Sequence, residues 1–317
     1  MKITANRLTL LRIILLPLPC LLLYGGPSAK LTAVGIGSLL GLTDYFDGLL
    51  ARRQGVTRLG AFLDPVADKV FIAAIYLFLV KLGFLPLWLV LGLLVREFLV
   101  ATLRTRVPGS LPVTWWAKVK TTCQMLVAAL IIALAAYPAH ALWFYLLAAA
   151  FLGLGAFWVK LERKYRGVLL AFSLLLPGCS LFSPPQQFLW LGLLALLVTW
   201  FSAWPYLRQG VVYLKRKEMG EVLAAVAFPA FIVLLLGRSG SGWFLVPLII
   251  ALEFLKEGLR LLAARKDFGP AWLLAALSLF AYFLPPGLVS AYLAVIFIYQ
   301  ASEVLKCFWE KRSDLLG

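Results

Sequence analysis

Two short stretches of this sequence contain its most informative side chains. Residues 44–52 read Asp44-Tyr45-Phe46-Asp47-Gly48-Leu49-Leu50-Ala51-Arg52, and residues 60–68, after a spacer of seven, read Gly60-Ala61-Phe62-Leu63-Asp64-Pro65-Val66-Ala67-Asp68. The four aspartates stand out because the chain of 317 residues has only 14 acidic residues and is 63% hydrophobic. Carboxylates grouped beside apolar segments are costly unless cations neutralise them, so we expect this group to be a functional site.

The apolar surroundings of these aspartates predict an all-α polytopic membrane protein. The mean hydropathy of +0.95 and the 14% of charged residues exclude a soluble globular domain. Uninterrupted apolar runs of about 18 to 23 residues recur, the length needed to cross about 30 Å of hydrocarbon, whereas the strands of a membrane β-barrel alternate apolar and polar residues. We predict about twelve spans, at residues 9–25, 31–50, 61–80, 84–105, 115–137, 140–159, 167–182, 187–208, 219–237, 242–263, 270–284 and 287–306.

The basic residues indicate how these spans are oriented. The net charge is +16, and most of the 30 basic residues fall in short connections at alternate ends of the spans. Positive charge collects on the cytoplasmic side, so we expect an even number of spans, both termini in the cytoplasm and the aspartates facing it. We assign the charge to topology and anionic lipid headgroups, not to nucleic acid. The expected location is the inner (cytoplasmic) membrane, with the first apolar run retained as a helix rather than cleaved as a signal peptide.

The spacing of the aspartates predicts a metal site. Asp44 and Asp47 are three residues apart and Asp64 and Asp68 are four apart, so each pair lies on one face of a helix. Four carboxylates brought together match the charge of two divalent cations. Oxygen ligands favour Mg²⁺, Mn²⁺ or Ca²⁺, and no histidine or cysteine lies nearby to favour zinc. Such a paired site suits phosphoryl transfer, with one carboxylate accepting the proton of an attacking alcohol.

Small and basic residues lie between the aspartates. Gly48, Ala51 and Gly60 allow a flat base or a diphosphate to approach the backbone, and they equally allow tight helix packing. Arg52 is either a phosphate contact or a cation that fixes topology. The alternative for the aspartates is a set of unrelated, solvated loop carboxylates, and the fixed positions of glycine, alanine and arginine between them argue against it.

The two stretches resemble the signature of the CDP-alcohol phosphotransferase family. That signature is D-x2-D-G-x2-A-R, a spacer of about eight residues, and G-x3-D-x3-D, and every fixed position is present here. The shorter spacer is the one departure, and it falls in a connection between spans, where a change of length is easily absorbed. Further segments are similar to the bacterial branch of the family that makes phosphatidylglycerophosphate: residues 6–12, 42–53, 57–69, 96–98, 118–122 with 124, 200–202 and 206–207.

This resemblance implies a fold, a reaction and roles for individual residues. The implied fold is a six-span core that forms a homodimer. The implied reaction is attack of glycerol 3-phosphate on CDP-diacylglycerol, giving phosphatidylglycerophosphate and CMP, with two divalent cations, Mg²⁺ or Mn²⁺, as cofactors. Metal binding is assigned to Asp44, Asp47, Asp64 and Asp68, and catalysis to Asp64 and to Asp68 as general base. Contact with the CDP group is assigned to Thr43, Asp44, Gly48, Ala51, Arg52 and Gly60.

The acceptor in this reaction has a phosphate of its own, which requires cations. Four basic residues flank one predicted cytoplasmic connection and are candidates to bind it: Arg104, Arg106, Lys118 and Lys120. For each residue taken singly, the alternative role of a cation that fixes membrane topology is almost as good an explanation. Arg104 and Lys118 are the preferred candidates. Glu97, which follows Arg96 within a span, is either half of an internal ion pair or part of the site.

The resemblance leaves much of the chain unexplained. We divide the chain into a catalytic core with five spans (1–137), an inserted helical hairpin (138–185), the last core span (186–217) and a four-span C-terminal extension (218–317). One helical face in the extension has alternating charges that would form an ion-paired seam: Glu253, Lys256, Glu257 and Arg260. We expect the extension to serve oligomer contacts or regulation rather than catalysis.

Three other functions are compatible with parts of the sequence. Another member of the same family would use a different acceptor, such as phosphatidylglycerol for cardiolipin, an inositol phosphate or serine. A twelve-span transporter would use the buried acids, but no inverted repeat or discontinuous helix supports it. A catalytically silent membrane scaffold would bind neither metal nor CDP.

Overall fold

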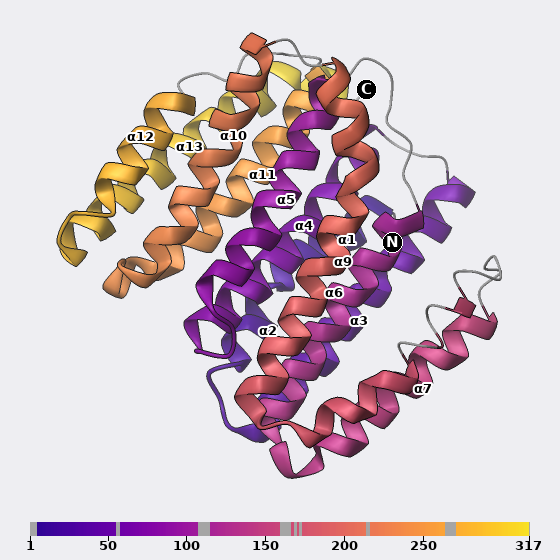
Figure 1. Ribbon diagram of the computed structural model, residues 1–317. Coiled ribbons are helices and arrows are strands. Elements are labelled where there is room, and N and C mark those ends of the chain that lie inside the picture. Colours follow the sequence, from indigo (N-terminus) through magenta and orange to yellow (C-terminus); the bar gives the residue numbers. More distant parts are fainter. Residues whose placement is uncertain are drawn as a thin grey trace.

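Long helices make up the protein, as its apolar runs predict. The computed structural model describes residues 5–54, 58–106, 115–158, 166–167, 170, 173–213, 216–263 and 271–316, and within these ranges it contains helices and turns but no strand (Figure 1). A helix satisfies its backbone hydrogen bonds within one segment, which hydrocarbon requires of a lone apolar span. The predicted all-α class is therefore confirmed for the described ranges.

The first half of the chain supplies the helices that contain the aspartate signature. They are α1 (Ala5–Leu15), α2 (Pro17–Leu22), α3 (Pro27–Gln54), α4 (Arg58–Lys81), α5 (Leu87–Arg106), α6 (Trp115–Ala136) and, after the 3₁₀ helix η1 (Pro138–His140), α7 (Ala141–Trp158). Proline begins α2 and α3, where its missing N–H costs no helical hydrogen bond. Gly83 turns the chain from α4 to α5 with a φ of 76°, a conformation that favours glycine.

The second half of the chain continues the bundle. Its elements are η2 (Leu176–Leu181), α9 (Pro184–Tyr213), α10 (Arg216–Leu234), η3 (Leu235–Gly237), η4 (Gly240–Phe244), α11 (Leu245–Ala263), α12 (Ala271–Ala281) and α13 (Pro286–Leu316). The four spans predicted after residue 218 correspond to α10, α11, α12 and α13. The span predicted at 167–182 lies partly outside the described residues, and its described end is the 3₁₀ helix η2.

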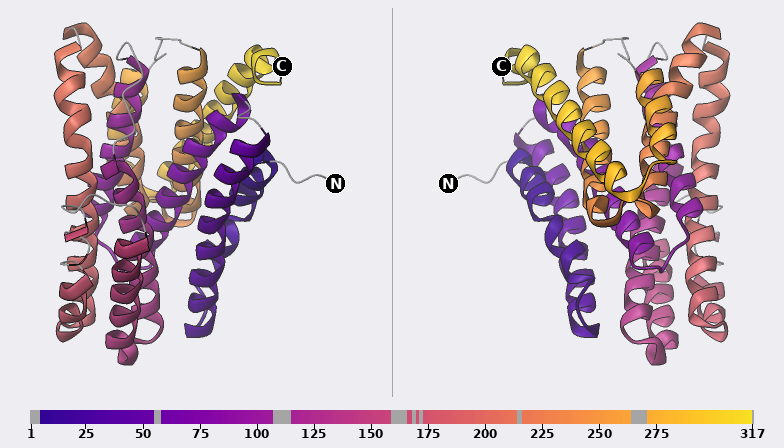
Figure 2. Two further views of the ribbon diagram at one scale, coloured as in Figure 1. Left: turned by 90° about the vertical axis from the view of Figure 1, so that its right-hand side faces the viewer. Right: turned by 90° about the vertical axis from the view of Figure 1, so that its left-hand side faces the viewer.

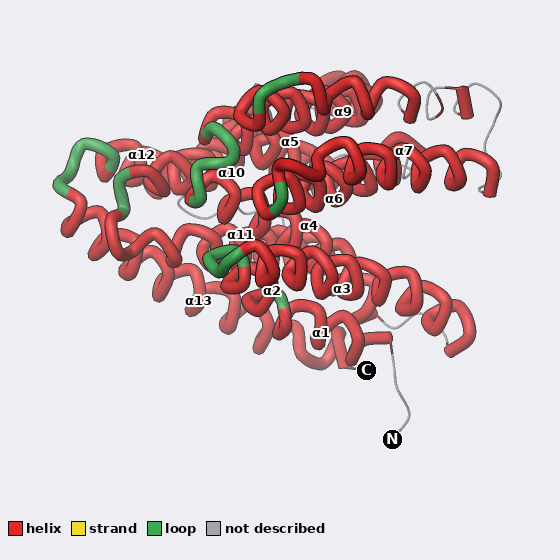
Figure 3. The backbone as a smooth tube through the Cα atoms, turned by 90° about the horizontal axis from the view of Figure 1, so that it is seen from below, coloured by secondary structure: helices red, strands yellow, loops and turns green. Residues whose placement is uncertain are grey.

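Helix α4 lies at the centre of this arrangement. It contacts α1, α5, α6, α11 and α13 (Figures 2 and 3). Every residue from 70 to 77 is buried, and Tyr76 and Leu77 are completely enclosed. The signature aspartates Asp64 and Asp68 lie nearer the start of the same helix, so the apolar part of α4 fixes the position of its polar part.

The C-terminal helices pack onto this core. Helix α11 contacts both α4 and α5, α13 lies against α11 and α4, and α10 lies against α5 and α12 (Figure 3). The outer surface of the bundle is apolar, with Trp143, Leu147 and Trp204 each at least 66% exposed. Such a surface suits contact with lipid chains.

Five of the described helices are long and apolar enough to cross a membrane, judged by length and composition. They cover Val119–Ala136, Pro138–Gly155, Pro184–Gly210, Met219–Gly237 and Pro286–Trp309. Helices α4, α5 and α11 are also long, but each contains several charged residues. The chain is therefore a multi-pass membrane protein, while the count of twelve spans and the cytoplasmic position of both termini stay predictions.

Candidate active site

Helix α1 holds the two aspartates of α4. The hydroxyl group of Thr9 donates a hydrogen bond of 2.7 Å to Oδ1 of Asp64, and Nη1 of Arg12 lies 2.8 Å from Oδ1 of Asp68. Thr9 and Arg12 are buried, whereas both aspartates are half-buried. The two contacting residues are three positions apart on α1 and four positions apart on α4. Each pair therefore lies on one helical face, and the two helices meet along these polar faces.

Arg12 also reaches α3. Its Nε donates to the hydroxyl oxygen of Thr43 at 3.4 Å, and that hydroxyl donates to the carbonyl oxygen of Leu40 at 2.6 Å. Thr43 directly precedes Asp44, the first residue of the signature. Because α1 contacts both α3 and α4, the guanidinium group of Arg12 links the two helices that contain the four aspartates.

The other signature residues are only partly placed. Gly60 is buried in the first turn of α4. Five more lie in α3 with side chains outside the described part of the chain: Asp44, Asp47, Gly48, Ala51 and Arg52. Among the side chains that are described, no three of histidine, cysteine, aspartate or glutamate gather as a metal site. The convergence of all four aspartates therefore stays a prediction.

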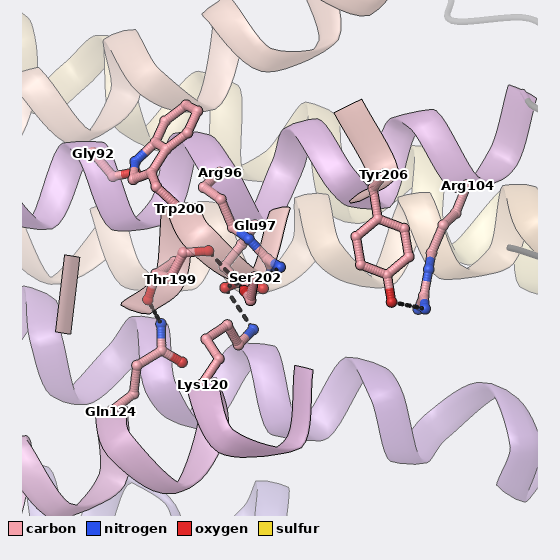
Figure 4. Close-up of polar contacts among 10 residues, drawn as sticks. All are labelled: Gly92, Arg96, Glu97, Arg104, Lys120, Gln124, Thr199, Trp200, Ser202 and Tyr206. Atoms are coloured by element: carbon pink, nitrogen blue, oxygen red, sulfur yellow. Dashed lines mark hydrogen bonds and ion pairs between the residues drawn. The ribbon is translucent and has the colours of Figure 1, made fainter. Parts of the chain in front are cut away.

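A second polar group is buried between α5, α6 and α9 (Figure 4). Oε1 of Glu97 lies 2.7 Å from Nζ of Lys120 and 3.2 Å from Nη1 of Arg96. Nη2 of Arg96 donates to the hydroxyl oxygen of Ser202 at 2.8 Å. All four side chains are buried. Helix α4, which contains Asp64 and Asp68, contacts both α5 and α6, the helices that contain Glu97 and Lys120.

Glu97 is the shared acid of this network. Glu97 forms the ion pair with Arg96 that was one of the two expectations, and it pairs with Lys120 as well. A buried carboxylate between two cations is held firmly, because loss of either partner would leave a charge unpaired. The predicted acceptor cation Lys120 is thus shared with Glu97, and the three N–H donors of an ammonium group allow a further contact.

Arg104 lies two turns beyond Glu97 on α5. Its Nη2 donates to the hydroxyl oxygen of Tyr206 on α9 at 3.1 Å, and its guanidinium carbon lies 4.9 Å from the centroid of the Tyr206 ring (Figure 4). Nε of Arg104 is buried and has no hydrogen-bond partner among the described residues. A guanidinium group that uses only some of its five N–H donors to contact a tyrosine retains others that can bind an anion. The side chains of Arg106 and Lys118 lie outside the described part of the chain.

Helix α9 is fastened to α5 and α6 by further hydrogen bonds. The side-chain amide of Gln124 donates to the hydroxyl oxygen of Thr199 at 3.0 Å, and the indole N–H of Trp200 donates to the carbonyl oxygen of Gly92 at 3.1 Å (Figure 4). These bonds join residues 75 and 108 positions apart in sequence. A segment remote from the signature therefore supplies one wall of the site.

Thr9 and Arg12 received no role from the sequence, although residues 6–12 were part of the resemblance. Arg12 could have been singled out from the sequence, because a cation inside an apolar run usually faces a polar partner in the interior of a bundle. The three-residue spacing of Thr9 and Arg12 also places them on one helical face. Neither feature identifies the partner, which only the packing of α1 on α4 shows.

Buried carboxylates and cations within a bundle of apolar helices can bind a phosphate-containing substrate. The comparisons with known proteins agree. A family model described as CDP-alcohol phosphatidyltransferase matches residues 2–159, from α1 through α7. The chain belongs to this family and is a CDP-alcohol phosphatidyltransferase.

Several curated proteins are similar to this chain. A "Probable phosphatidylglycerophosphate synthase" of Mycobacterium tuberculosis (strain ATCC 25618 / H37Rv) is 41% identical over 155 residues, which cover 47% of this chain and 74% of the relative. A "CDP-diacylglycerol--glycerol-3-phosphate 3-phosphatidyltransferase" of Escherichia coli (strain K12) is 41% identical over 128 residues, 37% of this chain and 70% of the relative. A protein of the same name from Sodalis glossinidius (strain morsitans) is 43% identical over 129 residues, 38% of this chain and 70% of the relative. No solved structure matches the chain significantly.

Proposed function

We propose that this enzyme transfers the phosphatidyl group of CDP-diacylglycerol to glycerol 3-phosphate, with phosphatidylglycerophosphate and CMP as products. The observation that carries the proposal is the setting of Asp68, which is paired with the buried Arg12 at 2.8 Å. A carboxylate paired with a cation suits a reaction in which a proton is taken up beside bound phosphates. The printed names of the relatives support glycerol 3-phosphate as the acceptor.

The four signature aspartates are proposed to bind two divalent cations, Mg²⁺ or Mn²⁺: Asp44, Asp47, Asp64 and Asp68. The described half of this donor set fits, because Asp64 and Asp68 are half-buried oxygen ligands on one face of α4. When bound, such cations would neutralise the charge that develops on the leaving phosphate. Thr9 and Arg12 would hold the two carboxylates of α4 in fixed orientations, as residues around metal ligands generally do.

Asp68 is the proposed general base, with Asp64 beside it. The hydroxyl oxygen of glycerol 3-phosphate would attack the phosphorus atom that bears the diacylglycerol. A new phosphorus–oxygen bond would form, the bond to the CMP oxygen would break, and the hydroxyl proton would pass to the carboxylate of Asp68. Arg12, which pairs with this carboxylate, would hold it in a fixed orientation.

The two substrates would approach this centre from different sides. The CDP group is proposed to lie along α3 and the start of α4, against Thr43, Asp44, Gly48, Ala51, Arg52 and Gly60. The acceptor phosphate is proposed to lie near Arg104 and Lys120, with Arg106 and Lys118 as further candidates. Arg104 is the best supported of these, since Tyr206 holds its guanidinium group while Nε lacks a partner among the described residues.

The setting of the reaction is also proposed. The site would face the cytoplasm from the inner membrane, where a water-soluble acceptor can reach a lipid-bound nucleotide, and the enzyme would act as a homodimer. The positive charge of the chain, +16, supports this orientation.

An acceptor panel tests the proposed function. Purified protein in detergent receives labelled CDP-diacylglycerol, Mg²⁺ or Mn²⁺ and one of four acceptors: glycerol 3-phosphate, phosphatidylglycerol, inositol phosphate or serine. We expect CMP release and a labelled phosphatidylglycerophosphate product with glycerol 3-phosphate alone. Turnover with a different acceptor would refute the substrate assignment within the family.

A further inference from the structure

Helix α11 lies outside the part of the chain that matches the family, yet it packs against two helices of the candidate active site (Figure 3). These are α4, which contains Asp64 and Asp68, and α5, which contains Glu97. Three residues of α11 are completely enclosed: Val246, Ile249 and Ile250. Helix α11 therefore belongs to the interior of the bundle.

Two aromatic contacts join α4 to α11 and to η4, which directly precedes α11. Nζ of Lys81, at the end of α4, lies 5.5 Å from the centroid of the Trp243 ring in η4, and the ring of Phe78 meets the same ring edge to face at 5.1 Å. Nζ of Lys69 lies 5.7 Å from the centroid of the Phe254 ring in α11. A cation within about 6 Å of an aromatic ring is attracted to its electrons. The order of the two contacts is reversed between the helices, so α11 runs antiparallel to α4.

Phe254 also contacts α5. Its ring stacks on the ring of Phe98, with centroids 4.1 Å apart and planes 3° from parallel, and both rings are 1% exposed. Lys69 directly follows Asp68, and Phe98 directly follows Glu97. One aromatic side chain of α11 thus touches α4 and α5 at the residues next to two charged side chains of the site.

The contact with Lys69 bears on how α4 is rotated about its own axis. Successive residues of a helix point about 100° apart. Asp68 accordingly faces α1, where Arg12 pairs with it at 2.8 Å, while Lys69 faces α11. Helix α4 is therefore held from two sides at the level of Asp68. The contact at Lys81 lies about 20 Å further along α4, at about 1.5 Å per residue, and is remote from that carboxylate.

We propose that Phe254 is a positioning residue of the transferase. Its ring holds α4 and α5 in the rotation and register that place the carboxylate of Asp68 for the reaction. This inference rests on the proposed role of Asp68 as general base. It assigns α11 a part in catalysis, where the sequence alone suggested oligomer contacts or regulation for the C-terminal region.

The first test removes the ring but keeps an apolar side chain. For Phe254→Leu we expect kcat for CMP release to fall about tenfold, while the KM values of both substrates stay within about threefold, because a displaced base weakens the transition state more than substrate binding. The full-length protein, purified in detergent and saturated with Mg²⁺ or Mn²⁺, is used throughout. An unchanged kcat would overturn the proposal.

Trp243→Leu is the matched control. It makes the same kind of replacement at the other aromatic contact with α4, where the cation is Lys81. Both leucine variants are expected to have a lower Tm, since each loses a packed ring. Only Phe254→Leu is expected to lose turnover, and Trp243→Leu should keep kcat within about twofold. If both variants lose kcat by the same factor, α11 only stabilises the fold and the proposal is wrong.

Phe254→Tyr separates position from stability. It keeps the ring but places a hydroxyl group in a buried position, which lowers stability. We expect a lower Tm together with a kcat within about threefold of the parent value. A kcat that follows Tm through all three variants would show that stability, not the ring, sets the rate.

Lys69→Met tests the same contact from α4. Lys69 is half-buried, so the fold should tolerate a change that keeps the length of the side chain but removes its charge. We expect kcat to fall about fivefold with little change in either KM. A parent-like kcat would contradict the proposed role of this contact.

A double-mutant cycle shows whether Phe254 acts through Asp68. In an Arg12→Gln background, where Asp68 has already lost the partner that holds it, Phe254→Leu should lower kcat by less than about twofold more. Independent, multiplicative losses would overturn the proposal.

The failure of this inference can be distinguished from failure of the proposed function. CMP release is measured with whichever acceptor the panel identifies, so a different acceptor leaves the comparison of Phe254→Leu and Trp243→Leu intact. Normal turnover by Asp68→Asn would refute the base on which the inference rests. An inactive Asp68→Asn variant together with equal kcat values for the two leucine variants would refute the role of Phe254 alone.

Discussion

The guanidinium group of Arg12 and the carboxylate of Asp68 form an ion pair at 2.8 Å between residues 56 positions apart in sequence. Arg12 is 3% exposed, and it also contacts Thr43 on a third helix. One buried cation thus fixes α1 against both helices that contain the aspartate signature. The pair orients the proposed base, so Arg12 links α1 to the proposed chemistry, as Thr9 does through Asp64.

Arg12 should therefore be essential for turnover in a way that depends on the shape of its guanidinium group. We expect Arg12→Gln to lower kcat/KM about a hundredfold and Arg12→Lys about tenfold, because an ammonium group keeps the charge but cannot contact Asp68 and Thr43 together. CMP release from CDP-diacylglycerol measures the effect. Equal activity of the glutamine variant and the parent enzyme would show that the pair has no role in catalysis.

Thr9 should matter through its hydroxyl group alone. Thr9→Val keeps the shape of the side chain but leaves the Asp64 oxygen without this donor, which corresponds to about 1–3 kcal/mol. We expect kcat/KM to fall about tenfold in the valine variant, whereas Thr9→Ser should retain most of the parent activity. The same loss in both variants would mean that packing, not the hydrogen bond to Asp64, is what matters at this position.

Glu97 should be required for the stability of the fold. Glu97→Gln removes the negative charge between Arg96 and Lys120 and leaves buried cations unpaired, for which we expect a loss of about 3–5 kcal/mol. Thermal unfolding in detergent measures this as a lower Tm. Ser202→Ala, which removes one neutral partner of Arg96, is the milder comparison, with an expected loss of about 1 kcal/mol. A glutamine variant as stable as the alanine variant would show that the network is not held by charge.

Metal dependence and the role of Asp68 can be separated by experiment. We expect chelation of divalent cations to abolish CMP release and added Mg²⁺ or Mn²⁺ to restore it. Asp68→Asn should lower kcat by at least about a thousandfold while sparing most of the binding of CDP, because it removes the proton acceptor and changes only one of four ligands. Normal turnover by the asparagine variant would refute its assignment as the base.

The sequence predicted the helical fold because its apolar runs are uninterrupted and of membrane-spanning length, whereas barrel strands alternate apolar and polar residues. It also identified the signature, since the spacing of Asp64 and Asp68 is a local property of one helix. Four helices after residue 218 were likewise predicted from hydropathy and turn residues and are present as α10 to α13, while their number of membrane crossings stays a prediction. The contacts of α1 were not, because a hydrogen bond between Thr9 and Asp64 depends on how two helices pack.

What the sequence determined by itself was the class of protein, the aspartate signature and the residue types available for binding phosphate. These are set by composition and by spacing along one chain. Only the tertiary structure decided which charges of different helices meet: Arg12 with Asp68, and Glu97 with Lys120. The physical reason is that ion pairs between helices require a particular rotation and register of each helix, which the packing of the whole bundle sets.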